Sequence, residues 1–106
     1  YAKRFVGKKF VNRSTGNEIE VPMSGVKHTL AGAADSLIKT IPAIPKIIQS
    51  SRLVATKEDK HNDPNIIAVE IYQAKVRVES LDKEVVMTVK HCRDGRRYYD
   101  HGYLKE

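Results

Sequence analysis

The N-terminal part of the chain shows two short alternating runs of apolar and polar residues. Residues 10–21 read FVNRSTGNEIEV, in which FVNR and EIEV flank the polar stretch STGN with Gly16. A Gly-containing polar loop between two such runs predicts a β-hairpin. Pro22 is expected to end it, because proline cannot donate a backbone hydrogen bond to a strand partner.

From Ser24 onward the apolar positions follow helical spacing, which predicts a first helix. These positions are Val26, Leu30, Ala33, Leu37 and Ile41. Ser24 is expected to be the N-cap, since its hydroxyl can accept a hydrogen bond from a first-turn N–H group.

Two prolines, Pro42 and Pro45, interrupt this run. Proline suits the first turn of a helix better than its interior, so IPAIPKIIQSSRLV (residues 41–54) is interpreted as a second helix. Its apolar face would consist of Ile44, Ile47, Ile48 and Leu53. The polar tract TKEDKHNDPN, residues 56–65, predicts an exposed loop.

After residue 65 the period of the pattern becomes two. The runs IIAVEIYQAKVRVES, EVVMTVKHC and RRYYDHGYL are rich in Val, Ile and Tyr, and are separated by LDK and by Asp94-Gly95. Asp-Gly between strand-like runs is a strong hairpin signal. The order predicts a single α+β domain over residues 1–106, with an N-terminal hairpin and two helices packed on a three- to four-stranded antiparallel sheet.

Each predicted strand has one more apolar face and one face that can remain hydrated. The hydrated face would carry Lys75 and Arg77, then Thr88 and Lys90. From the last strand it would carry either the set Arg97, Tyr99 and His101 or the set Arg96, Tyr98 and Asp100. A one-residue slip exchanges the two sets, so the pattern alone leaves both open.

Composition narrows the functional classes. The chain has 106 residues, 41% of them hydrophobic, and 19 Lys+Arg against 13 Asp+Glu, which gives a net charge of +6. Such a surplus attracts polyanions, most commonly nucleic acid, although a basic surface that only confers solubility is an equal alternative.

No apolar run approaches the roughly 18 residues that a membrane span needs. The lone Cys92 fits a reducing compartment and is interpreted as a small core residue.

A hydrated sheet face of this kind has the groups that RNA cleavage without a metal requires. A base must take the proton of a 2′-hydroxyl, an acid must protonate the leaving oxygen, and cations must stabilise the charge at phosphorus. Histidine suits the first two roles and lysine or arginine the third, while tyrosine can stack on a base or donate a proton.

The start of the first helix places Lys27, His28 and Thr29 side by side. Free N–H groups at a helix N-terminus bind phosphate, and Lys27 and Thr29 would add a charge and a hydroxyl. The positive end of a helix disfavours protonation of His28, so more of it would be neutral and able to act as a base. The alternatives are that these side chains are simply solvated, or that Asp35 holds His28 on the same helix face.

The sequence contains no motif for nucleotide binding, metal binding or nucleophilic catalysis. The sequence has no glycine-rich phosphate loop, no CxxC, no HExxH and no nucleophile elbow. His61 and Asp63 are close in the sequence, but two residues on a loop do not define a metal site. We therefore expect neither a metal nor another cofactor.

The segments TGNEIEV, SGVKHT, IPKIIQSS and DGRRYYDHGYL occur in an order that resembles the small ribonuclease domains of the barnase/EndoU/colicin-like superfamily. The most similar are those at the C-termini of contact-dependent growth-inhibition toxins and of phage polyvalent proteins. The resemblance implies a metal-independent endoribonuclease that often acts on tRNA and is blocked by an immunity protein. In that superfamily a helix carries the base or the phosphate ligand, and by the resemblance this role falls on Lys27 and His28. The catalytic residues of the final strand would be Tyr99 and His101, with Arg97 beside them. No glutamate stands plainly at the position of a barnase-type base.

The resemblance also implies a C-terminal toxin domain that is secreted or delivered from the cell surface and acts in the cytoplasm of a target cell. The expected catalytic residues are His28, Lys27, Tyr99 and His101, and the expected substrate-binding residues are Thr29, Thr88, Lys90, Arg96 and Arg97. The expected partners are RNA, an acidic immunity protein and a host activating protein, and no membrane. The alternative is a non-catalytic accessory domain of a phage or secreted polyprotein that binds nucleic acid or protein.

Overall fold

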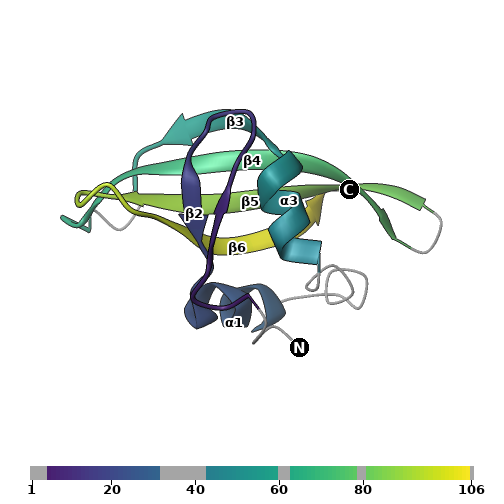
Figure 1. Ribbon diagram of the computed structural model, residues 1–106, viewed down its shortest axis with the longest axis horizontal. Helices are drawn as coiled ribbons and strands as arrows, with labels where there is room; N and C mark the ends of the chain where they lie inside the picture. The colour runs from purple at the N-terminus through teal and green to yellow at the C-terminus, as the bar shows by residue number, and fades with distance from the viewer. Residues whose placement is uncertain (1–4, 32–42, 60–62, 79–80, 106) are drawn as a thin grey trace.

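The computed structural model describes residues 5–31, 43–59, 63–78 and 81–105. The elements in chain order are β1 (Lys9–Val11), β2 (Glu18–Glu20), α1 (Met23–Ala31), α3 (Ile44–Ser50), β3 (Arg52–Lys57), β4 (Ile66–Val78), β5 (Leu81–Cys92) and β6 (Arg97–Lys105). The strands form one sheet in the order β1-β2-β6-β5-β4-β3. In Figure 1 the strands β3 to β6 lie side by side, the N-terminal hairpin and α3 cross in front of them, and α1 lies along β6.

The sheet is larger than expected and is mixed. The N-terminal hairpin is confirmed, with Phe10 opposite Ile19 in an antiparallel pair. The hairpin then joins the main sheet through a parallel pair, Glu20 beside Tyr98 of β6. The expectation of a purely antiparallel sheet of three to four strands is therefore wrong, because the hairpin extends the sheet beyond β6 and β3 extends it beyond β4.

Helix α1 begins one residue before Ser24. The carbonyl of Pro22 accepts hydrogen bonds from the N–H groups of Gly25, at 3.2 Å, and Val26, at 3.4 Å, which closes the first turn. Ser24 therefore lies within the helix and is not its N-cap. Lys27 lies beyond the first-turn N–H groups that are free to bind an anion. The remaining apolar positions of the predicted first helix, from residue 32 to residue 41, lie outside the described residues.

The second predicted helix is confirmed in its first half. Ile44, Ile47 and Ile48 are buried on α3, and Pro45 lies in its first turn. The helix ends at Ser50, since Ser51 has an extended backbone, and Arg52 then begins β3. Leu53, expected on the helix face, lies on this edge strand with 38% of its surface exposed.

The main core lies between the sheet and the elements that cross its front face. It contains Ile19, Val26, Tyr72, Met87 and Tyr99, none more than 3% exposed. Burial of apolar surface of this kind supplies most of the stabilisation of a small domain.

The buried side chain of Asn12 links the hairpin to the end of α3. Its Nδ2 donates to the carbonyl oxygens of Ile48, at 2.7 Å, and Ser51, at 2.8 Å. Its Oδ1 accepts from the backbone N–H groups of Ser14 and Thr15 at 3.1 and 3.0 Å. One asparagine therefore both shapes the hairpin loop and fixes it to the helix.

Asp94-Gly95 forms the turn between β5 and β6, as predicted. The N–H of Cys92 donates to the carbonyl of Arg96 at 2.8 Å, and Gly95 has a φ of 91°, a conformation that glycine adopts without strain. The residues LDK belong to β5 and do not form a separate loop, since Asp82 pairs with Arg77.

Candidate functional site

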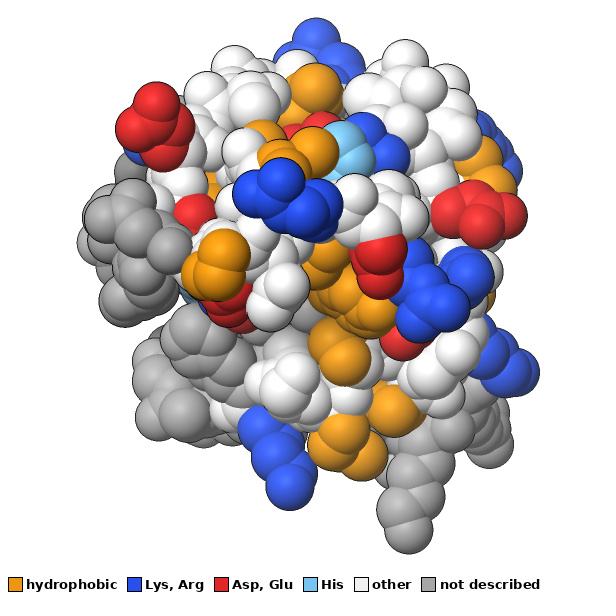
Figure 2. Space-filling model, turned by 90° about the vertical axis from the view of Figure 1, so that its left-hand side faces the viewer, with side chains coloured by type: hydrophobic (Ala, Val, Ile, Leu, Met, Phe, Trp, Pro, Cys, Tyr) orange, Lys and Arg blue, Asp and Glu red, His pale blue; other side chains and the backbone are white. Residues whose placement is uncertain are grey.

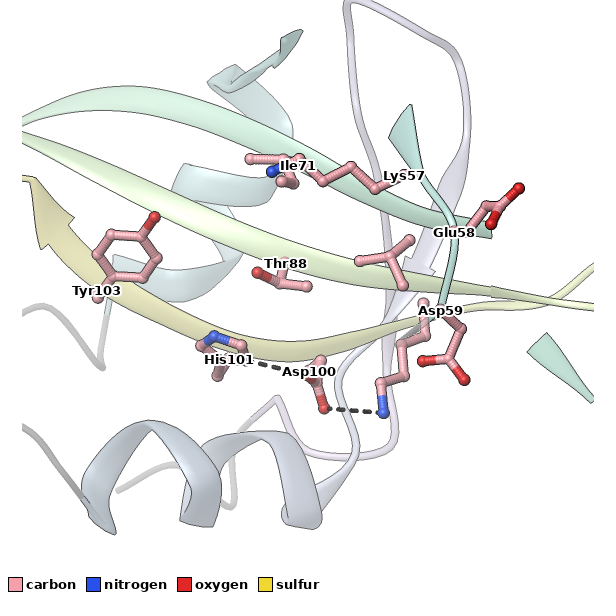
Figure 3. Close-up of a pocket in the computed structure, with 10 residues that line it drawn as sticks. Lys57, Glu58, Asp59, Ile71, Thr88, Asp100, His101 and Tyr103 are labelled. Carbon is pink, nitrogen blue, oxygen red and sulfur yellow. Dashed lines mark hydrogen bonds and ion pairs between the residues drawn. The ribbon is translucent and has the colours of Figure 1, made fainter. Parts of the chain in front are cut away.

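The face of the sheet turned away from α3 is hollowed where β3, β4, β5 and β6 lie together. The hollow has a volume of about 360 Å³. Its lining residues are Lys57, Glu58, Asp59, Val69, Ile71, Thr88, Lys90, Asp100, His101 and Tyr103. Figure 3 shows these side chains above the strands, with His101 and Asp100 on β6 and Thr88 on β5.

A bulge in β6 decides which of its residues enter the hollow. Thr88 lies opposite His101, but the next residue of β5, Val89, lies opposite Tyr99, so Asp100 is the extra residue. A bulge of this kind breaks the alternation of side chains along a strand. Both Asp100 and His101 therefore line the hollow, whereas Tyr99 is 3% exposed in the core.

The bulge divides the expected set Arg97, Tyr99 and His101. His101 lies on the open face, and Tyr99 lies in the core on the opposite face. The other set that the pattern left open fits the open face: Tyr98 lies opposite Lys90, Asp100 lines the hollow, and Arg96 contacts the hydroxyl of Tyr98. The bulge adds His101 to this face, which strict alternation would not allow.

Asp100 connects the histidine to a lysine. Nδ1 of His101 lies 2.9 Å from Oδ2 of Asp100, and Nζ of Lys90 lies 3.8 Å from Oδ1 of the same carboxylate. A carboxylate accepts hydrogen bonds, so Nδ1 of the histidine carries the proton and the lone pair of the neutral ring is on Nε2. All three side chains are partly buried, with exposures between 22 and 32%. The arrangement orients a histidine for proton transfer beside a cation.

The charges around the hollow are mixed. Lys57 and Lys90 contribute positive charge, and Glu58, Asp59 and Asp100 contribute negative charge. Figure 2 shows a similar mixture at one end of the molecule, where Lys and Arg side chains are interspersed with Asp and Glu. The excess of positive charge is therefore not gathered into one uniform patch on this end.

Arg97 takes part in a separate network, on the core side of the sheet. Its Nε donates to Oε1 of the buried Glu70 at 3.0 Å, and the hydroxyl of Tyr72 donates to the same oxygen at 3.2 Å. Nη2 of Arg97 also lies 3.5 Å from Nδ1 of His91. Burial is the main cause that raises the pKa of Tyr72, and Glu70 raises it further, against hydrogen bonds from Asn17 and Thr15 that lower it. This cluster joins β4, β5 and β6 at a distance from His101.

Arg96 is exposed beside the β5–β6 turn. Its Nη1 lies 3.4 Å from the hydroxyl of Tyr98, and this hydrogen bond is the main cause that raises the pKa of the guanidinium. Among the described residues that line the hollow with His101, Arg96 is not included.

Helix α1 lies against the part of β6 that carries Asp100 and His101, which we call the dyad. Gly25 packs directly on the backbone of Tyr99, so the helix runs close along the strand, as Figure 3 also shows. Lys27 is exposed on this helix. The side chains of His28 and Thr29 lie outside the described part of the structure, so their expected roles stay predictions.

Of the nine expected site residues, Thr88, Lys90 and His101 are brought together in one hollow. Sequence reasoning missed Lys57, Asp100 and Tyr103 as members of that hollow. Lys57 had been assigned to a loop, and Asp100 to the set opposite His101. The one available signal was the run Asp-His-Gly-Tyr, which places a carboxylate next to a histidine and a tyrosine two residues further on.

Among the described residues, no group of three or more His, Cys, Asp and Glu side chains is placed to hold a metal ion. No helix in the same residues is long and apolar enough to cross a membrane.

No curated protein and no solved structure matches the chain significantly. A family model does match, over residues 1–99, and it is that of large polyvalent protein-associated domain 3. Because the match covers nearly the whole chain, the chain belongs to the family of large polyvalent protein-associated domain 3.

Proposed function

We propose that the chain is a metal-independent endoribonuclease domain whose active site is the open-face hollow. The observation that carries the proposal is the pair of Asp100 and His101, held at 2.9 Å beside Lys90 in an open cavity. A histidine oriented by a carboxylate is a common arrangement for general acid–base catalysis.

The proposed reaction is a transfer of the phosphodiester within RNA. Nε2 of His101 takes the proton of a 2′-hydroxyl, and the 2′-oxygen forms a bond to phosphorus. The bond to the 5′-oxygen breaks, and that oxygen leaves with a proton from the general acid. The products are a 2′,3′-cyclic phosphate and a 5′-hydroxyl. His28 is the proposed acid, on the helix that lies along β6.

Lysines supply the charge stabilisation in this mechanism. Lys57 and Lys90 line the hollow from β3 and β5, and Thr88 lines it from β5, opposite His101. Preorganised cations at the phosphate stabilise the extra negative charge of the transition state. The ion pair with Asp100 keeps Lys90 in place before substrate binds.

The test is incubation of the purified domain with total RNA in excess EDTA. We expect cleavage by the native protein and a loss of about 10² to 10⁴ in rate for His101→Ala, the range that a general acid–base group contributes. His91→Asn is the matched control, because this histidine lies in the Arg97 network and should be dispensable for cleavage. Intact RNA with native protein, or equal rates for His101→Ala and native protein, would reject the proposal.

The biological setting proposed for this activity is that of a toxin acting on tRNA in the cytoplasm of a competitor cell. Expression of the native domain should arrest growth, and expression of His101→Ala should not. Sequencing of tRNA ends after induction would identify the RNA that is cut.

A non-catalytic accessory domain is the second candidate. It is favoured by the mixed charge of the hollow, where Glu58, Asp59 and Asp100 accompany the two lysines, and it agrees with membership of a polyvalent protein-associated family. This reading predicts RNA or protein binding with no new RNA ends in the EDTA assay. Any RNA binding should weaken steeply with salt as counterions are released.

A further inference from the structure

We infer that the open-face hollow binds an unpaired nucleobase, which stacks on Tyr103 beside the catalytic dyad. The inference rests on the proposed ribonuclease function and names its substrate class as single-stranded RNA. Tyr103 has no part in the mechanism described above.

Tyr103 is a large aromatic side chain on the open face of β6, opposite Val86 of β5, and it is more exposed than the other tyrosines of the core strands. It is 48% exposed, whereas Tyr72 and Tyr99 on the other face are at most 3% exposed. Figure 3 shows its ring broadly face-on above the strands, as seen from the open side. The ring therefore offers a flat surface to anything that enters the hollow.

The histidine extends this surface. The rings of Tyr103 and His101 are inclined by only 24°, with their centroids 6.4 Å apart. Two nearly parallel rings on successive outward positions of one strand form a platform, and aromatic platforms on open sheets are a common means of holding unpaired bases.

The surroundings of the platform match a nucleotide. Val69 and Ile71 of β4 give the hollow an apolar lining, with β5 between them and the rings, and Lys57 and Lys90 supply positive charge that can meet a backbone phosphate. A base stacked on Tyr103 would place its attached ribose near His101, the adjacent outward-facing aromatic residue.

The geometry also favours one form of RNA. In a duplex both faces of an internal base are covered by its neighbours, so none is available to Tyr103. An unpaired base in a loop can turn one face to the ring. Stacking of this kind depends little on base identity, because every base has an aromatic face.

The experiment measures binding of a short fluorescent oligodeoxythymidine strand, which lacks the 2′-hydroxyl and so cannot be cleaved. A strand of the same length with abasic sites has the same phosphates but no bases. For native protein we expect the abasic strand to bind about five- to a hundredfold more weakly, the effect of losing a stacked base. Tyr103→Phe should keep this difference, and Tyr103→Leu should abolish it.

The results separate this inference from the ribonuclease proposal. Equal affinity of native protein for the two strands, or an unchanged difference in Tyr103→Leu, would overturn the stacking platform even if the protein cleaves RNA. A large base-dependent difference that Tyr103→Leu removes would support the platform even if total RNA stays intact in EDTA. Lys46→Ala, at an exposed position of α3 outside the hollow, is the control variant and should leave the difference between the two strands unchanged.

Discussion

At the scale of single residues, the hydroxyl of Tyr72 lies in the core and donates to Glu70. Burial raises the pKa of Tyr72 above the ordinary value of about 10. The native state therefore holds this proton at a pH where the unfolded chain has already released it. The contribution of Tyr72 to stability is complete below about pH 10 and is lost as pH rises from there through the folded pKa.

Urea unfolding of native protein and Tyr72→Phe between neutral and strongly alkaline pH would measure this effect. We expect the free energy of unfolding of the native protein to fall more steeply above about pH 10, with an additional slope of up to about 1.4 kcal/mol per pH unit. Below that pH the difference between the two proteins should be constant. Parallel curves over the whole range would contradict the assignment.

At the scale of elements, α1 approaches β6 closely because Gly25 has no side chain. A Cβ at this position would overlap the carbonyl oxygen of Tyr99 and lie 2.9 Å from its Cδ2. In an exposed helix, Gly→Ala stabilises by about 1 kcal/mol. Here the overlap with backbone atoms outweighs that gain, since neither the helix nor the strand can move without disturbing the core.

Gly25→Ala is therefore expected to destabilise the domain by about 1–3 kcal/mol, the usual cost of overpacking. Thermal unfolding followed by circular dichroism would measure it. Ser24→Ala, on the exposed neighbouring position of the same helix, should change stability by no more than about 0.5 kcal/mol. A neutral or stabilising Gly25→Ala would show that α1 does not pack on β6 in this way.

The elements with strong local patterns could be predicted from the sequence. The N-terminal hairpin, the first half of α3 and the Asp94-Gly95 turn depend on residues that are adjacent in the chain. Strand β3 was missed because RLVATK lies between a helical pattern and a polar tract, and at an edge it has few buried side chains to mark it. The pairing of Glu20 with Tyr98 joins residues far apart in the sequence, and no local pattern reports it.

Part of the candidate site could be predicted from the sequence, and part could not. Thr88 and Lys90 were assigned correctly to one hydrated face, because β5 alternates regularly. Tyr99 was assigned to the same site as His101, and the single extra residue at Asp100 reverses that assignment. A bulge is set by how β6 pairs with β5, so alternation within β6 could not reveal it.

At the scale of the whole molecule, the net charge of +6 bears on what the domain binds. A producer of a ribonuclease needs an inhibitor, and we propose an acidic immunity protein that covers the hollow and the neighbouring Lys27 of α1. Charge complementarity would speed its association and favour this partner over others. A host protein that activates the enzyme is a further proposed partner.

Chemical modification of histidines in the complex would test direct occlusion by such an inhibitor. We expect His101 to be protected, and His91, on the other network, to change little. Association should slow by about tenfold or more as salt rises well above physiological levels, because steering by charge is screened. Full reactivity of His101 in an inactive complex would mean that the inhibitor acts elsewhere.

The parallel pairing of β2 with β6 also bears on how the chain folds as it is synthesised. Within this domain, β2 and α1 are synthesised early, and both have their partner in β6, the strand of the domain that is synthesised last. Contacts between such distant parts of a chain form slowly, and a domain generally folds as a unit. Until β6 has left the ribosome, the nascent chain would therefore lack both the complete sheet and the Asp100–His101 pair. On the proposed function, the domain would be inactive until that strand has emerged.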